Sequence, residues 1–207
     1  MSHRAGRTRW RRFAVILVPG VAACAALGVA MAQGVLAASF FISGQQFQVS
    51  ADSLTARGFS LYGMIDVTRE HRLVPVAVSG FRHATVEGLC QSVVVDVPVV
   101  GTQTLRLTGG GGRPVEASNL FIDATTESVG EANFNGLDIG VAQGAVTKGP
   151  IRSGDRNSQF FDPDGVAQQA VSTTLNDVRV TALAVSAGTF NIPGLRVRLR
   201  QGDHSCF

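Results

Sequence analysis

The chain has 207 residues, of which 45% are hydrophobic, and a formal net charge of +3 at pH 7. Five of the 18 Lys and Arg residues precede Phe13, which leaves 13 basic residues against all 15 Asp and Glu residues and a net charge of −2 for the remainder. Because the basic excess is confined to the N-terminus, nucleic acid is not an expected partner.

Residues 1–38 are predicted to be an export segment. Five arginines and no acidic residue precede an apolar run of 20 residues, Phe13 to Ala32. Ala30–Ala32 or Val35–Ala37 offers small residues to a signal peptidase. Arginines that stay inside orient such a segment so that the following chain is translocated. The run is longer than a usual signal sequence and close to the ~20 residues that span a bilayer. Cleavage as a signal peptide and retention as a signal-anchor helix therefore both remain open.

Residues 39–207 are predicted to form one exported all-β domain, since about 170 residues suffice for one core and fit two poorly. Apolar residues alternate with polar ones, and no window shows a 3.6-residue period. The last alternating segment, Leu195–Arg200, is expected to be a half-buried strand, with three arginines on one face and the apolar residues on the other. The other strand candidates are Phe47–Ser50, Val93–Val97, Leu105–Leu107, Leu120–Asp123 and Val178–Val180.

Four pairs of turn-forming residues interrupt these strands, and Gly and Asn favour such corners because they tolerate positive φ. Their spacing is too irregular for a repeat with a fixed rung. We therefore predict an antiparallel sheet curled into a sandwich or half-barrel, with an irregular β-solenoid as the alternative. The predicted corners are Val86–Leu89, Phe134–Leu137, Leu175–Val178 and Ile192–Leu195.

Two stretches are predicted to be loops. Thr108–Pro114 contains four consecutive glycines and is expected to be a flexible hairpin tip. Residues 148–165 are polar and are expected to be either a functional lid or a disordered excursion. Asp162 and Asp164 in this loop faintly resemble a calcium loop, because hard cations bind several oxygens on a bent backbone. Whether the 148–165 loop binds an ion is left open, with an ordinary turn as the default.

Cys90 and Cys206 are predicted to form a disulfide. The third cysteine, Cys24, lies inside the apolar run, and thiols outside the cytoplasm oxidise. The alternatives are two unrelated small residues, or a bond from Cys206 to another chain.

No residues are predicted to be catalytic or to bind a metal or cofactor. Ser60 is flanked by glycines, but the second comes one residue too late for Gly-x-Ser-x-Gly. Ser53 with Asp203 and His204 resembles the triad of a second class of esterase, but the acid and base are adjacent instead of being separated by two residues. The histidines beyond the apolar run have no partner at metal-ligand spacing.

Several blocks are similar to a family of actinomycete proteins of unknown function that are exported or membrane-associated. The blocks are Met31–Phe40, Leu89–Val93, Leu105–Gly112, Asn119–Asp123 and Ala187–Leu195. Members are often named cholesterol esterase, but the resemblance supplies no catalytic residues. It implies an exported or membrane-associated protein, and it supports the disulfide because the family tends to end in a cysteine near the C-terminus, as Cys206 does.

The sequence thus predicts a non-enzymatic protein of the cell envelope outside the cytoplasm, secreted or anchored to the membrane by its N-terminal helix. Low charge and many Phe and Val residues favour binding of an apolar ligand such as a lipid, or of a membrane-protein partner. The alternatives are a lipid-ester hydrolase that uses Ser53 or Ser60, and a purely structural surface protein. The ligand-binding residues and the oligomeric state stay unknown.

Overall fold

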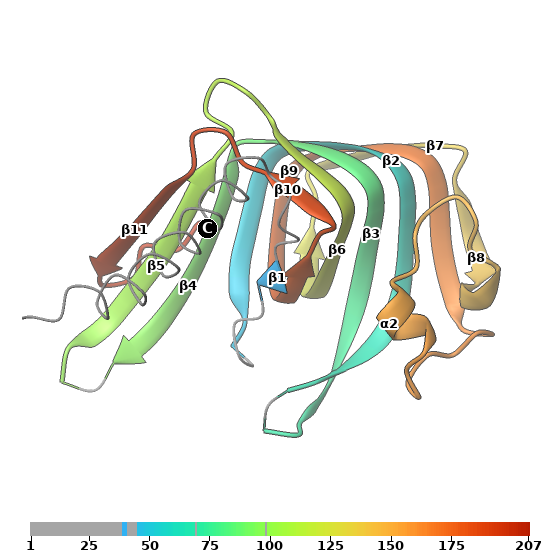
Figure 1. The fold of residues 1–207 in the computed structure, drawn as a ribbon, viewed down its shortest axis with the longest axis horizontal. Helices are drawn as coiled ribbons and strands as arrows, with labels where there is room; N and C mark the ends of the chain where they lie inside the picture. Colours follow the sequence, from blue (N-terminus) through green and yellow to red (C-terminus); the bar gives the residue numbers. More distant parts are fainter. Residues whose placement is uncertain (1–38, 41–44, 69, 98) are drawn as a thin grey trace, which may run out of the picture. The chain divides into compact units, whose positions relative to one another are not determined.

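The structure is a computed structural model that describes residues 39–207 except 41–44, 69 and 98 (Figure 1). The predicted export segment, residues 1–38, lies outside the described residues. Among the residues described, no helix is long and apolar enough to cross a membrane.

Within the residues described, eleven strands form a single antiparallel sheet, which four long strands curl into an arch (Figure 1). These are β2 (Phe47–Val67), β3 (Leu73–Glu87), β6 (Val115–Ser128) and β9 (Val166–Ser186). β2 pairs with β3, β3 with β6, β6 with β9 and β9 with β2, so the pairings form a closed circuit. The predicted antiparallel sheet is confirmed, as one sheet instead of the two of a sandwich. The solenoid alternative is wrong, because each described pairing is antiparallel.

Three strands extend the sheet beyond this circuit, and we call them the arm. They are β4 (Leu89–Val97), β5 (Gly101–Gly109) and β11 (Arg196–Gln201). β4 pairs with β2 over three residues, β5 pairs with β4, and β11 pairs with β5 at the outer edge. In Figure 1 the arm lies to the left of the arch.

The remaining elements are short. β1 (Ser39–Phe40), β7 (Glu131–Asn135) and β8 (Asp138–Ala142) pair with β9, and β10 (Thr189–Asn191) pairs with β6. A 3-10 turn, η1 (Gln143–Ala145), and one helical turn, α2 (Ser153–Arg156), follow β8.

The sheet buries apolar side chains on both faces. Successive strand residues point to opposite faces, and the neighbours Phe121 and Ile122 belong to two different buried clusters. The inner cluster draws Leu54, Phe81 and Val180 from strands of the closed circuit, so it lies inside the curl. The outer cluster is covered by residues 143–165, which we call the covering segment.

Residues with a left-handed backbone reverse the alternation within the long strands. In β9, Leu175 and Val178 both point into the inner cluster because Asp177, at φ 53°, lies between them. The predicted corner at Leu175–Val178 is therefore wrong: it is a bend inside a 21-residue strand. The other three predicted corners do separate strands, and their glycines 88, 136 and 194 have φ of 65°, 61° and 66°.

The covering segment is packed against the sheet, so the expected disordered excursion is wrong. Gly149 lies so close to β2 that a Cβ atom on it would be 2.2 Å from the carbonyl carbon of Phe59. The hydroxyl of Ser60 donates a hydrogen bond to the carbonyl of Pro150. The side-chain oxygen of Gln169 accepts hydrogen bonds from the backbone N–H groups of Thr147 and Lys148, at 2.8 and 2.9 Å.

Candidate functional site

The arm presents two chemically different faces. In the register of β11 on β5, Arg198 lies opposite Arg106, and Leu199 lies opposite Leu105. Alternation therefore gathers the arginines on one face and the apolar residues on the other. The apolar face of β11 is exposed, which corrects the expected half-buried strand, because β11 has a neighbour on only one side and Leu199 has no layer above it.

The glycine-rich loop positions β11. A Cβ atom at Gly109 would lie 2.1 Å from Cγ2 of Ile192, so only glycine leaves room for that side chain. The backbone N–H of Gly110 donates a 2.9 Å hydrogen bond to the carbonyl of Pro193. The chain then turns at Gly194 and returns along β5. The loop joins β5 to β6, which do not pair with each other, so the expected hairpin tip is wrong.

The arginine face contains a hollow of about 230 Å³, which we call the arginine groove. Its lining holds no acidic residue and consists of Arg106, Thr108, Arg196, Arg198 and Arg200. Within the part of the chain that the structure describes, ion pairs are made by other cations, and none of these four arginines takes part. Four guanidinium groups thus face one hollow without a carboxylate partner.

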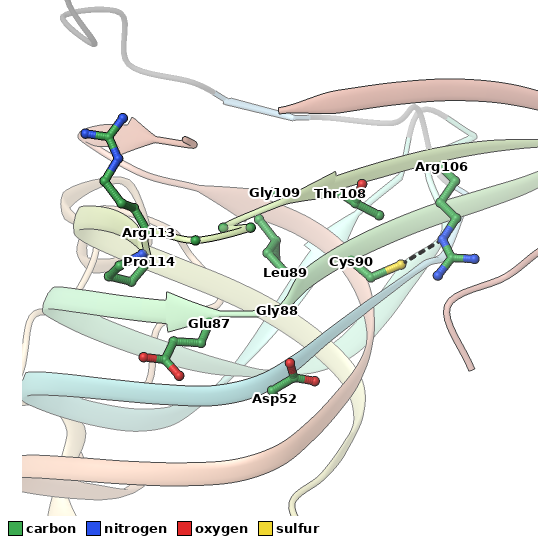
Figure 2. Close-up of a pocket in the computed structure, with 13 residues that line it drawn as sticks. Asp52, Glu87, Gly88, Leu89, Cys90, Arg106, Thr108, Gly109, Arg113 and Pro114 are labelled. Carbon is green, nitrogen blue, oxygen red and sulfur yellow. Dashed lines mark hydrogen bonds between the residues drawn. The ribbon is translucent and has the colours of Figure 1, made fainter. Parts of the chain in front are cut away.

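A larger hollow of about 580 Å³ adjoins the groove and shares Arg106 and Thr108 with it (Figure 2). We call it the glycine pocket, because Gly109–Gly112 form one wall. Figure 2 shows Arg106 beside Cys90, with its Nε atom 3.2 Å from the sulfur, and Asp52 and Glu87 on the strands below. The pocket therefore carries charges of both signs, whereas the groove carries only positive charge.

Asp52 is held against a glycine at the floor of this pocket. Gly88 has a φ of 65°, and a Cβ atom on it would lie 2.0 Å from Oδ2 of Asp52. The left-handed backbone favours glycine at this position, whereas the exposed side chain of Asp52 could rotate away from a Cβ atom. The predicted corner at Val86–Leu89 thus shapes the pocket as well as ending β3.

The C-terminal tail closes the other end of the arginine face. Cys206 is bonded to Cys90, with a Cα–Cα distance of 5.9 Å, so the predicted disulfide is present. Ser92 accepts a 2.9 Å hydrogen bond from the backbone N–H of Cys206, and the hydroxyl of Thr104 donates a 2.6 Å hydrogen bond to the carbonyl of Gly202. The tail therefore lies across β4 and β5 and borders the groove.

The structure does not assemble the triad that Ser53, Asp203 and His204 would form. Ser53 pairs with Glu87 in the β2–β3 ladder, whereas a ring nitrogen of His204 lies 3.1 Å from the carbonyl oxygen of Gln201. Ser60 is buried under the covering segment and bonded to Pro150. Neither serine lines the pocket or the groove.

A second polar cluster fastens the covering segment. Arg152 donates to both carboxylate oxygens of Asp123 and, at 3.4 Å, to Oδ1 of Asp155, and its guanidinium lies 5.1 Å from the ring centre of Phe121. Burial raises the pKa of the Asp123 carboxyl, and the guanidinium of Arg152 opposes this shift. Burial and the charge of Asp123 raise the pKa of Asp66 to about 6. Because Arg152 lies in the covering segment and Asp123 lies on β6, their ion pair ties the segment to the sheet.

The acidic residues of the 148–165 loop do not form an ion site with their neighbours. The backbone N–H of Asp164 donates a 3.1 Å hydrogen bond to Oδ1 of Asp162, which is an ordinary Asx turn. No three His, Cys, Asp or Glu residues gather as metal ligands anywhere in the described ranges.

Alternation along the sequence predicts the three arginines of β11 on one face, but it does not predict Arg106, which completes the groove from β5. The alternation in Leu105–Leu107 predicts a strand that contains Arg106. It does not predict that this strand pairs with Leu195–Arg200.

A family model described as a family of unknown function (DUF6230) matches residues 43–207. No curated protein and no solved structure matches the chain. The match confirms the expected membership of a family without an assigned function, and it covers the curled sheet, the arm and the tail. The chain belongs to the DUF6230 family.

Proposed function

We propose that the protein is a non-enzymatic binding protein of the cell envelope, placed outside the cytoplasm, and that its arginine groove binds phosphate or carboxylate groups. The observation that carries this proposal is the gathering of Arg106, Arg196, Arg198 and Arg200 around one hollow that has no acidic lining. Guanidinium groups bind both anions through two parallel hydrogen bonds.

The composition of the domain makes this gathering specific. The chain after the N-terminal arginines has a net charge of −2, yet four of its 13 basic residues line the groove. Charged residues on an edge strand also hinder pairing with other chains. This second role explains the three arginines of the edge strand β11 without a ligand. Arg106 lies on β5, inside the edge, so edge protection leaves it unexplained.

The spacing of the arginines favours a ligand with more than one anionic group. Arg196, Arg198 and Arg200 alternate along β11, which places their Cα atoms about 7 Å apart along the strand. A polyanion that reaches two or three of them gains from multivalency, whereas a single phosphate does not.

Binding of an apolar ligand and hydrolysis of a lipid ester have weaker support. The apolar cavity inside the curl, which Val49, Leu120 and Val178 help to line, is about 40 Å³, whereas pockets for small-molecule ligands measure roughly 300–1,000 Å³. An esterase needs an accessible nucleophile, and the hydroxyl of Ser60 is buried and bonded to a carbonyl.

The location outside the cytoplasm is supported by the arginine-led apolar run at the N-terminus and by the Cys90–Cys206 bond. The tail that borders the groove depends on this bond. An oxidising compartment would therefore maintain the disulfide that holds the C-terminal tail in place.

The proposal is tested by titrating the full chain, reconstituted into phosphatidylcholine vesicles, with sodium polyphosphate and with inorganic phosphate. We expect polyphosphate to bind more tightly than phosphate and to be released as salt is raised. Phosphatidylglycerol in the vesicles weakens polyphosphate binding if lipid headgroups occupy the groove, and leaves it unchanged if the anion comes from solution. Failure of polyphosphate to bind at low salt would overturn the proposal.

A further inference from the structure

The edge strand β11 leaves part of its backbone without a partner strand. Among the described strands β11 has one neighbour, β5, and its residues are exposed along its whole length. The backbone N–H of Gly202 donates a hydrogen bond to the carbonyl of Thr102, at the end of this ladder. Bonded and non-bonded positions alternate in an antiparallel pair, so the backbone groups of the three β11 arginines point toward β5. The N–H and C=O groups of Val197 and Leu199 therefore point outward.

An apolar row of side chains crosses the arm and ends at this free edge. Leu199 lies opposite Leu105, and Leu105 lies opposite Val93. The exposed fraction rises from 6% at Val93 to 40% at Leu105 and 67% at Leu199. The row thus begins in the inner cluster, to which Val93 belongs, and becomes uncovered toward β11. One more strand beside β11 would place a side chain next to Leu199 and continue the row.

A row of positive charge crosses the opposite face of the arm. Arg198 lies directly opposite Arg106, and like charges in this position destabilise a sheet. Neither guanidinium makes an ion pair with another residue that the structure describes. An acidic side chain on a strand beside β11 would lie next to Arg198 and offset this repulsion. The free edge therefore favours a strand in which acidic residues alternate with apolar ones.

A second copy of β11 does not meet this requirement. Because the free backbone groups belong to Val197 and Leu199, two copies would pair with these residues opposite one another. Each arginine would then lie opposite an arginine of the other copy, which adds like-charge repulsion. The charges that hinder self-pairing thus select a partner strand of opposite charge.

We infer that β11 binds an extended acidic peptide segment as an added antiparallel strand. In this mode of recognition, main-chain hydrogen bonds supply affinity and alternate side chains supply specificity. Carboxylates two residues apart repeat about every 7 Å along a strand, as the arginines of β11 do. The inference rests on the proposed function, because it identifies the carboxylates of a polypeptide as the anionic groups that the arginine groove binds.

The test uses three peptides with blocked ends and the full chain in phosphatidylcholine vesicles. The parent peptide, Glu-Val-Glu-Val-Glu, can place its carboxylates beside the arginines of β11 and its valines beside Val197 and Leu199. A second peptide carries an N-methyl group on each valine, which removes the N–H groups that face β11 in the antiparallel register. The matched control carries N-methyl groups on the second and third glutamates, whose N–H groups face away from β11. The two methylated peptides have the same charge and composition.

We expect isothermal titration at low salt to show similar binding of the parent and the control. The valine-methylated peptide should bind at least about tenfold more weakly, because hydrogen bonds to β11 are lost. Equal affinities of the two methylated peptides would show charge attraction without strand pairing and would overturn the inference. Hydrogen exchange locates the bound peptide: we expect slower exchange of the amides of Val197 and Leu199. Protection of a different strand edge would also overturn the inference.

Sodium polyphosphate, titrated in the same samples, separates this inference from the proposed function. Binding of polyphosphate without binding of the parent peptide would overturn the added strand and leave the arginine groove as an anion site. Failure of both to bind would overturn the proposed function, and the inference with it.

Discussion

The hydroxyl of Tyr62 donates a 2.6 Å hydrogen bond to Oδ2 of Asp155, although the two residues are 93 positions apart. The same hydroxyl accepts a 3.3 Å hydrogen bond from the backbone N–H of Arg152. Tyr62 lies on β2 and Asp155 on α2, and both are buried. This contact therefore ties the covering segment to the outer face of the sheet.

Tyr62→Phe is expected to lower the free energy of unfolding by about 1–3 kcal/mol, because it leaves a buried carboxylate oxygen and a backbone N–H without a partner. Urea denaturation followed by circular dichroism measures this loss. Limited proteolysis should show faster cleavage within residues 148–165. An unchanged urea midpoint would mean that the covering segment is held by its apolar contacts alone.

Asp66 is expected to make the domain less stable as the pH rises from about 4 to about 6. Burial raises its pKa from 3.8 to about 6 in the folded chain, so the folded state holds the proton more tightly than the unfolded state. The contribution of protonated Asp66 to the free energy of unfolding is complete below the pKa of the unfolded chain. It is lost as the pH rises through the pKa of the folded chain. Asp66→Asn should reduce the loss in free energy of unfolding between pH 4 and pH 6 by about 1 kcal/mol. This value is lowered to allow for the partial exposure of the carboxylate. Parallel pH profiles of urea midpoints for the two chains would contradict this.

Gly149→Ala is expected to destabilise the chain by roughly 3 kcal/mol or more, in the range of other overpacking changes. The new Cβ atom would lie 2.2 Å from the carbonyl carbon of Phe59, and backbone cannot move aside as a flexible side chain can. Gly154→Ala is the matched control from the same segment, because nothing lies within 4 Å of its Cβ position. Thermal unfolding should separate the two variants; equal melting temperatures would contradict the close contact with β2.

The parts of the fold that follow from local alternation could be predicted from the sequence. Val93–Val97 lies in β4, and the opposite faces of Arg198 and Leu199 are as expected. The bends were missed because a single residue such as Asp177 reverses the alternation without ending the strand, and in a sequence it looks like a turn. The contact of Arg152 with Asp123 joins residues 29 positions apart, and no local pattern encodes such a pairing.

Only part of the candidate site could be predicted, because alternation is local and strand pairing is not. Alternation placed Arg196, Arg198 and Arg200 on one face, but the partner strand that adds Arg106 is fixed by tertiary packing at Gly109 and Ile192. The burial of Leu199 was wrongly expected because alternation shows that two faces differ, while the position of a strand at the sheet edge decides whether the apolar face is covered.

A reporter fused after Phe207 is expected to be active only outside the cytoplasm. Five arginines before the apolar run are expected to keep the N-terminus inside and to direct residues 39–207 across the membrane. Neutral replacement of these arginines should impair export and leave the circular dichroism of the domain unchanged. Reporter activity confined to the cytoplasm would contradict the proposed location.

The most direct test of anion binding compares two triple variants that lose the same charge. Arg196→Gln, Arg198→Gln and Arg200→Gln together should weaken polyphosphate binding about tenfold or more, because charge-assisted hydrogen bonds are removed from the groove. Arg57→Gln, Arg82→Gln and Arg179→Gln remove three exposed arginines elsewhere and should leave the affinity close to that of the wild type. Isothermal titration at low salt measures all three chains, and an equal loss of affinity in both triple variants would show that net charge, and not the arginine groove, holds the anion.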